Sequence, residues 1–234
     1  MKIVCLIQAR LNSSRCPGKV LEKIGPMSML NHVRGRCEMI EERFPVYVIS
    51  PVEDAVALDA IGVPSLQNDV LGRYVWAAGS LSADAVMRVT GDCPFLDPAI
   101  AKEVYEAFCT GNYDYVANDI VKTYPDGLGV EIITTEALQY ADEHSPPDMP
   151  EREHVTPFII RHLERRNPQT PKLFEGLNIR CPSAGLSNIK LSVDTPSDLA
   201  LARAIHSVGP RSTAMADTLV AYRKVMDGKN QGST

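Results

Sequence analysis

The sequence predicts an α/β protein with a mostly parallel sheet that is flanked by helices. Two observations favour this class. Short apolar runs alternate along the chain with segments in which apolar residues recur at helical intervals. Several of the apolar runs end in a glycine or in a polar loop, as strands of a parallel sheet do when a helix follows. A length of 234 residues suits one domain, with room for a small excursion.

Taken in order, the elements follow from these patterns. Strands are expected at 3–7, 46–50, 63–66 (after a break at Gly62), 85–90, 115–118, 129–133 and 191–193. Helices are expected at 29–41, 54–61, 70–81, 97–108, 153–165, 198–205 and 213–226. The proline-rich segment 145–150 is expected to form a lid or a dimer arm, within an excursion over about 113–150. One domain would then cover 1–226, and the polar tail 227–234 is expected to be disordered.

Composition excludes several classes of protein. The net charge of −5 argues against general binding of nucleic acid and against an anionic membrane surface. The six cysteines form no Cys-x-x-Cys pair, so neither a zinc site nor a disulfide framework is indicated. The first apolar run is too short for a signal peptide or a membrane span. We therefore expect a cytoplasmic protein with free thiols.

The loop after the first strand carries the strongest functional signal. It holds Arg10, Arg15 and Lys19, together with the hydroxyls of Ser13 and Ser14. Ligands of open α/β sheets bind at the ends of such strands, and three cations there suggest a polyanion such as a triphosphate. The loop matches neither the Walker motif nor the dinucleotide-binding glycine motif. The alternative is a solvated basic turn.

Two aspartates follow later apolar runs. Asp92 comes one glycine after the expected strand 85–90, and Asp194 directly follows 191–193. Carboxylates beside a triphosphate are suited to Mg²⁺, which takes one or two of them together with phosphate oxygens. Each could instead cap the helix that follows, and Asp97, just before Pro98, is the better cap candidate.

Five motifs occur in order along the chain: Gln-Ala-Arg-x-x-Ser-Ser-Arg-x-Pro-Gly-Lys (8–19), Arg-Val-Thr-Gly-Asp-Cys-Pro-x-x-Asp-Pro (88–98), Tyr-Pro-Asp-Gly-x-x-Val-Glu (124–131), Arg-Glu-His-Val-Thr-Pro-Phe-Ile (152–159) and Ser-Val-Asp-Thr-Pro-x-Asp-Leu (192–199). This set resembles the SpsF-like (spore-coat polysaccharide) branch of the cytidylyltransferases. That branch is related to the enzymes that make CMP-3-deoxy-manno-octulosonate and CMP-sialic acids. The resemblance runs from Lys2 to about Met226.

The resemblance implies a GT-A-like, Rossmann-type nucleotidyltransferase fold. It also implies transfer of a nucleotidyl group from a nucleoside triphosphate, with CTP as the expected one, and release of pyrophosphate. It implies that the triphosphate is gripped by Arg10, Arg15 and Lys19. It implies nucleotide contacts from Leu6, Ile7, Gln8, Ala9, Ser14, Arg73 and Asp92, and Mg²⁺ held by Asp92 and Asp194. The acceptor side would consist of Arg88, Asp126, Glu131, Arg152, Glu153 and His154.

The expected acceptor is a small anionic compound, a sugar acid, a sugar phosphate or a phosphonate, in the synthesis of a surface glycan. By resemblance, the excursion over 113–150 would pair two subunits into a homodimer. Cys16 and Asn12 depart from the family pattern without removing a charge. The paired arginines that bind the carboxylate in the sialic-acid branch are not recognisable.

Two other functions fit parts of the pattern. A GT-A glycosyltransferase would use a nucleotide sugar and an Asp-x-Asp motif, but Asp92 is followed by Cys93 and Pro94. A nucleotide-binding protein without activity would have no need to keep both aspartates and all three cations.

Overall fold

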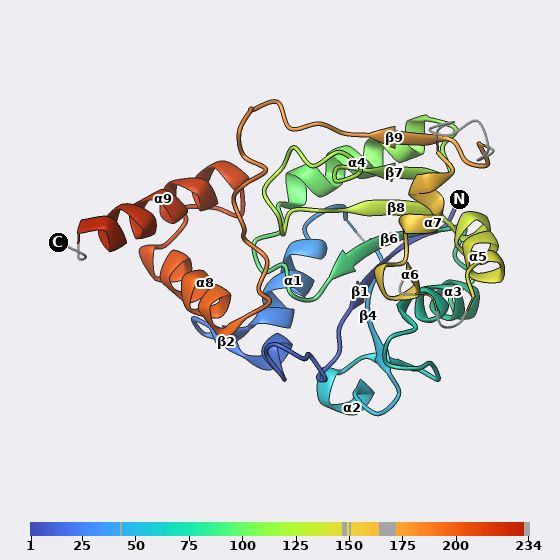
Figure 1. Ribbon diagram of the computed structural model, residues 1–234, viewed down its shortest axis with the longest axis horizontal. Helices are drawn as coiled ribbons and strands as arrows, with labels where there is room; N and C mark the ends of the chain where they lie inside the picture. Colours follow the sequence, from blue (N-terminus) through green and yellow to red (C-terminus); the bar gives the residue numbers. More distant parts are fainter. Residues whose placement is uncertain (43, 147–148, 150, 164–171, 232–234) are drawn as a thin grey trace.

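A seven-stranded sheet forms the centre of the computed structural model, which describes residues 1–42, 44–146, 149, 151–163 and 172–231 (Figure 1). The strand order is β5-β4-β1-β6-β8-β7-β9. The strands are β1 (Ile3–Gln8), β4 (Val46–Pro51), β5 (Ile61–Val63), β6 (Ala85–Thr90), β7 (Tyr115–Ala117), β8 (Glu131–Thr134) and β9 (Gly176–Asn178). Only β8 runs antiparallel to its described neighbours, β6 and β7. The expected mostly parallel α/β sheet is confirmed.

Helices cover both faces of the sheet, as the alternation of buried residues in β1 requires. Cys5 and Ile7 face α1 (Met29–Cys37) and α4 (Pro98–Thr110). Val4 and Leu6 face the opposite layer. That layer consists of α3 (Val70–Ser80), α5 (Thr135–His144), α6 (Glu151–His154) and α7 (Pro157–Arg161). A short helix, α2 (Ala55–Leu58), follows β4.

A third cluster lies beside the sheet and packs against the loops at one of its edges (Figure 1). It contains α8 (Pro196–Val208), α9 (Met215–Gln231) and the hairpin of β2 (Lys23–Ile24) and β3 (Met27–Ser28). Phe95, Leu191 and Val193 join its core. Since Phe95 follows β6 and Val193 precedes α8, this cluster brings distant loops together at the edge of the sheet.

The segment around Gly62 differs from the expectation. The strand β5 covers 61–63 rather than 63–66, and Gly62 lies inside it instead of breaking the chain before it. A Cβ atom on Gly62 would lie 3.0 Å from the Ala55 Cβ and 3.2 Å from the Val52 Cα. The glycine is therefore there because α2 packs directly on the strand. Accordingly, α2 is shorter than the expected helix over 54–61.

The expected strand 191–193 is not part of the sheet. A single bridge pairs Lys190 with Asp126. Beyond it, Leu191 N donates to Asp126 O, and Val193 N donates to Asp92 O. The segment is thus extended, but it is bound to two loops rather than to a neighbouring strand, which explains its apolar, strand-like sequence.

Other differences concern helices. Over its described part, up to residue 163, the expected helix 153–165 is replaced by two short helices, because Val155 adopts φ +71° and Pro157 begins the second of them. Residues 164 and 165 lie outside the described part of the chain. The helix α5 and the strand β9 were not expected, and α1 ends at Cys37 rather than at Glu41. The helix α9 continues to Gln231, so residues 227–231 of the expected disordered tail are helical. Residues 232–234 lie outside the described part of the chain.

The expected excursion over 113–150 contributes β7, β8 and α5 to the sheet and its cover. Residues 147, 148 and 150 of the expected lid or dimer arm lie outside the described residues. Among the helices that the structure describes, none combines the length and the apolar character needed to cross a bilayer.

Candidate active site

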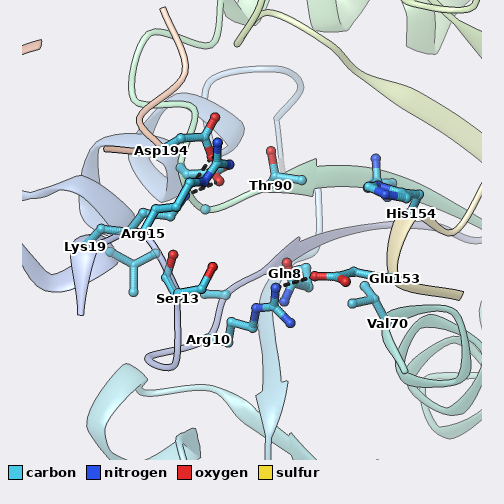
Figure 2. A pocket seen from close by; sticks show the side chains of 16 residues that line it. Gln8, Arg10, Ser13, Arg15, Lys19, Val70, Thr90, Glu153, His154 and Asp194 are labelled. Atoms are coloured by element: carbon cyan, nitrogen blue, oxygen red, sulfur yellow. Dashed lines mark hydrogen bonds and ion pairs between the residues drawn. The ribbon is translucent and has the colours of Figure 1, made fainter. Parts of the chain in front are cut away.

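A cavity of about 320 Å³ opens at the carboxyl ends of β1 and β6 (Figure 2). The loop after β1, the loop after β6, the start of α3 and the helix α6 all contribute to its walls. The described residues that line it are Gln8, Ala9, Arg10, Ser13, Ser14, Arg15, Lys19, Val20, Val70, Arg88, Thr90, Gly91, Asp92, Glu153, His154 and Asp194. Thus all three cations of the basic loop and both predicted metal ligands face one space.

Lys19 lies at the centre of one end of this cavity. Gly18 adopts φ +70° and leads into the 3₁₀ turn Lys19–Leu21, which directs the buried lysine inward. The Lys19 Nζ donates to Asp92 Oδ2 at 2.7 Å and to Asp194 Oδ1 at 3.3 Å. It also donates to Val193 O at 2.7 Å. One ammonium group therefore marks the point on which both carboxylates converge.

The start of α8 positions Asp194. Thr195 and Asp198 form a capping box at this helix start, and the Asp194 N donates to Asp198 Oδ2 at 3.0 Å. The Asp194 carboxylate is paired with Arg15 at 3.0 Å and with Lys190 at 3.1 Å. Burial by itself raises the pKa of Asp194, but the bonds and charges of Lys190 and Lys19 outweigh it and lower that pKa. Asp194 is therefore ionised at neutral pH.

The donor set of Asp92 and Asp194 fits a divalent cation such as Mg²⁺. Both offer hard carboxylate oxygens, and their shared contact with the Lys19 Nζ shows that they converge on one point where positive charge is stabilised. Among the described residues, no group of three or more His, Cys, Asp or Glu could hold an ion. An ion here would therefore take further ligands from phosphate and water, as Mg²⁺ usually does.

Arg10 lies at the other end of the cavity (Figure 2). Its guanidinium donates to Gln67 O at 3.1 Å and to Asn68 Oδ1 at 3.0 Å. It also forms an ion pair with Glu153 of α6, which closes the cavity on that side. A phosphate group that bound Arg10 would compete with Glu153 for the same guanidinium.

Arg152 anchors α6 rather than lining the cavity. It is buried, and its guanidinium is paired with Asp69 at 2.9 Å and with Asp142 of α5. Asp69 also caps α3, so one arginine ties α6 to two helices. The charge on Arg152 thereby fixes the position of its neighbours Glu153 and His154, which do face the cavity.

Arg88 joins the cavity to a buried cluster of charges. Its guanidinium is paired with Glu131 of β8, which also accepts a hydrogen bond from the Tyr115 hydroxyl. Burial lowers the pKa of Arg88, but the Glu131 carboxylate outweighs burial and raises it. Asp119 lies nearby, and burial together with the Glu131 charge raises the pKa of Asp119 to about 7. Glu131 thus holds Arg88 in place and is itself buried.

Several predicted nucleotide-binding residues lie outside the lining. Leu6 and Ile7 are fully buried in the sheet, while their neighbours Gln8 and Ala9 do line the cavity. Arg73 is also fully buried, and it donates to Leu66 O and Gln67 O, the second of which also accepts from Arg10. Arg73 therefore supports the loop that holds Arg10.

Asp126, predicted on the acceptor side, lies in the turn before β8 and accepts a hydrogen bond from Ser192 Oγ. It ties that turn to the segment that carries Asp194. The predicted site did not include Val20, Val70, Thr90 and Gly91, and it included Ser13 only as a hydroxyl of the basic loop. The signals available were that Ser13 lies in the basic loop and that Thr90 and Gly91 directly precede Asp92. The apolar Val20 and Val70 gave none.

Comparison with known families agrees with this geometry. The model of the family described as cytidylyltransferase matches residues 4–206. The chain belongs to the cytidylyltransferase family. It is thus an enzyme of the nucleotidyltransferase type, and the family predicted from the five motifs is confirmed.

Relatives of this cytidylyltransferase extend over most of the chain. An uncharacterized protein of Methanocaldococcus jannaschii is 30% identical over 210 residues, which cover 86% of this chain and 82% of the relative. The spore coat polysaccharide biosynthesis protein SpsF of Bacillus subtilis is 24% identical over 93% of this chain and 92% of its own. A 3-deoxy-manno-octulosonate cytidylyltransferase of Chloroherpeton thalassium is 25% identical, with 88% of this chain and 98% of its own covered.

Solved structures share the fold of this cytidylyltransferase. A cytidylyltransferase of Leptospira borgpetersenii superposes with a TM-score of 0.79 at 24% identity, over 99% of this chain and 95% of its own. A CMP-2-keto-3-deoxy-manno-octonic acid synthetase in complex with CTP superposes with a TM-score of 0.64 at 17% identity, over 88% of this chain and 99% of its own. The expected Rossmann-like nucleotidyltransferase fold is confirmed.

Proposed function

We propose that this chain transfers CMP from CTP to a small anionic sugar acceptor, with release of pyrophosphate and with Mg²⁺ as the metal ion. The observation that carries the proposal is the convergence of Lys19 with Asp92 and Asp194 in a cavity that Arg10 and Arg15 also line. Cations and paired carboxylates in one cavity match the charges of a triphosphate with its metal ion.

In the proposed reaction, an acceptor oxygen attacks the α-phosphorus of CTP, and the bond from that phosphorus to the bridging oxygen of pyrophosphate breaks. When the acceptor oxygen is a hydroxyl, its proton would pass to water. Arg10, Arg15 and Lys19 would hold the phosphates and stabilise the charge that develops on the leaving pyrophosphate. Asp92 and Asp194 would hold Mg²⁺, which when bound neutralises charge on the phosphate oxygens. Catalysis would then consist mainly of positioning and charge stabilisation.

The acceptor side of the cavity would consist of Arg88 together with Glu153 and His154 of α6. Glu131 and Arg152 would act indirectly, because each is buried and holds a lining residue or its helix in place. Arg88 is the cation in this part of the described lining. Glu131 occupies its Nη1, and the remaining donors of the guanidinium would suit an acceptor with a carboxylate, phosphate or phosphonate group. The names of the relatives support a sugar acid as the acceptor and the synthesis of a surface polysaccharide as the pathway.

We also propose, from the family resemblance, that the protein is a cytoplasmic homodimer.

The experiment is a thermal-shift panel of CTP, UTP, ATP, GTP, dTTP and UDP-glucose, each with and without Mg²⁺. A ligand that binds the native state raises the melting temperature as its concentration exceeds its Kd. We expect a shift with CTP that Mg²⁺ increases, followed by release of pyrophosphate when 3-deoxy-manno-octulosonate is added. A shift with UDP-glucose alone would favour a glycosyltransferase. CTP binding with no pyrophosphate released from any sugar acid, sugar phosphate or phosphonate would favour a binding protein without activity.

A further inference from the structure

A second cavity, of about 550 Å³, lies between α1, α8 and the loop that follows β6. It shares none of its described lining residues with the first cavity, which we call the nucleotide cavity after the proposed function. Its volume falls in the range of pockets that enclose whole small molecules, about 300–1,000 Å³. Phe95 contributes to its wall and lies three positions after Asp92, so the cavity is behind the loop that carries this aspartate.

The walls of this second cavity are mostly apolar. Phe95 belongs to the core cluster beneath α8, and Ile24 of β2 is buried next to it. Met27 and Met39 stand at the opening with 45% and 60% of their surface exposed. Flexible methionines at a cavity mouth adapt to ligands of different shape, and exposed apolar side chains gain free energy when a ligand covers them.

One cation is built into the apolar wall. The Arg36 Nη1 donates to Leu96 O at 2.8 Å and to Thr213 O at 2.9 Å, and its guanidinium lies 6.0 Å from the centre of the Phe95 ring. No ion pair joins Arg36 to a described carboxylate. Asp97 is the nearby acid, but its carboxylate accepts from the backbone of Ala99, Ile100 and Met215. Among the described residues, the hydrogen-bond acceptors of Arg36 are thus carbonyl oxygens, while the Asp97 charge acts on it without an ion pair.

Two histidines continue the same wall. The rings of His32 and His206 meet edge to face with their centres 5.3 Å apart. His32 Nε2 lies 2.7 Å from Ile24 O, which fixes this ring. His206 lies directly over Gly25, where a Cβ atom would be 2.1 Å from its Nε2. Neither ring pairs with an acid in the described part of the chain, and no aspartate or glutamate lines the cavity.

From this arrangement we propose that the second cavity binds a small molecule that combines an apolar ring system with an anionic group. The ring system would lie against Phe95 and the methionines, and the anion would bind to Arg36, beside the two histidine rings. The argument is charge complementarity: a chain of net charge −5 has a cavity here whose described lining contains a cation, two imidazoles and no acid. This site is independent of the proposed transfer reaction.

Gly35 allows a direct test, because it lines the cavity from the last turn of α1 and a Cβ atom there meets nothing within 4 Å. Gly35→Leu would place a bulky side chain in part of the cavity, remove no hydrogen bond and favour the helix by up to about 1 kcal/mol. Gly79→Leu is the matched control, since Gly79 is a helical glycine of α3 with equally open surroundings that lines neither cavity.

The probe is the dye 1-anilinonaphthalene-8-sulfonate, whose fluorescence rises in apolar sites. We expect one dye per folded chain, with unchanged affinity in Gly79→Leu and affinity at least tenfold lower in Gly35→Leu. 2-Naphthalenesulfonate should displace the dye at least about tenfold better than the neutral 2-naphthalenesulfonamide, because only the anion pairs with Arg36. Arg36→Met should abolish that preference.

Equal dye binding by Gly35→Leu and native protein would overturn the site. Displacement of the dye by CTP would place it in the nucleotide cavity and overturn the site as well. Equal displacement by the sulfonate and the sulfonamide would overturn the anionic class of ligand. A thermal shift with CTP and Mg²⁺ is measured on every variant. Its absence in all of them, native protein included, would contradict the proposed function without bearing on the second cavity.

Discussion

The Lys19 Nζ lies 2.7 Å from Asp92 Oδ2, although 73 positions separate the two residues in the chain. A loop after β1 and a loop after β6 meet here because β1 and β6 are parallel neighbours whose carboxyl ends share one edge. The pair defines the point where charge is stabilised in this cavity, and it is the first place to test.

Asp92→Asn should lower the rate of CMP transfer by about a hundredfold or more, because a group that stabilises charge at the reaction centre is lost. The melting temperature should fall by only a few degrees, since the ion pair with Lys19 is partly exposed on the Asp92 side. Steady-state kinetics and a melting curve check both statements. Asp59→Asn is the control, because Asp59 is an exposed partner of Arg34 outside the cavity. Near-native activity in Asp92→Asn would contradict the role of Asp92.

Glu153→Gln should tighten CTP binding by up to about fivefold. The change leaves the shape of the side chain but releases Arg10 from an ion pair worth about 1 kcal/mol, so a phosphate no longer has to displace Glu153. Calorimetric titration with CTP and Mg²⁺ measures the change. Glu151→Gln, in the same short helix but paired with Arg161, should leave the Kd unchanged. Weaker CTP binding in Glu153→Gln would instead show that Glu153 is needed to hold Arg10 in place.

Asp119→Asn should stabilise the protein at pH 8 and have little effect at pH 4. The folded pKa of Asp119, about 7, lies above the ordinary value of 3.8, so the folded state holds the proton longer than the unfolded state. The free energy of unfolding of the native protein therefore decreases as pH rises from about 4 to about 7 and stays lower above that.

The groups that act on Asp119 are Glu131, which repels its charge, and Arg88 and Lys122, which attract it. The gain in Asp119→Asn at pH 8 should stay below about 4 kcal/mol, since one pKa unit corresponds to about 1.4 kcal/mol. Urea unfolding at both pH values gives the difference, with Asp59→Asn as the exposed control. A variant that is less stable than the native protein at pH 8 would exclude a raised pKa at this position.

Gly127→Ala should lower the free energy of unfolding by about 2–4 kcal/mol, from backbone strain and overpacking together. Gly127 adopts φ +97°, and a Cβ atom there would lie 2.5 Å from Ser192 N. Urea denaturation of native and variant protein tests this. Gly185→Ala has a similar positive φ with open space around it, so it should cost only about 1 kcal/mol. If the two variants lose the same stability, close packing against Ser192 is not the reason for the glycine.

The sequence was sufficient to find the residues that follow parallel strands. Asp92 and the basic loop come directly after apolar runs that form β6 and β1, and local order alone puts such residues at one edge. The antiparallel strand β8 is different, because its direction depends on pairing with β6 and β7. Glu131 stands at the start of β8, where no local pattern reveals that its carboxylate is buried against Arg88.

Charge in a motif also does not tell which way a side chain points. Arg73 and Arg152 were predicted to contact ligands, yet Arg73 is held by carbonyl groups and Arg152 by carboxylates of neighbouring helices. Their burial depends on the packing of α3, α5 and α6 against one another. Likewise, the break between α6 and α7 depends on the left-handed conformation of Val155, a residue type that seldom adopts it.

The balance of charge in the nucleotide cavity has a consequence for how its ligands cooperate. Its described lining carries four cations, Arg10, Arg15, Lys19 and Arg88, against three carboxylates, Asp92, Glu153 and Asp194, and Glu131 behind the lining pairs with Arg88. A triphosphate entering alone would leave a large negative excess, and a divalent cation entering alone would meet carboxylates already neutralised by Lys19 and Arg15. In the proposed reaction each ligand would therefore strengthen the binding of the other, and by thermodynamic reciprocity CTP would raise the affinity for Mg²⁺ by the same factor by which Mg²⁺ raises the affinity for CTP.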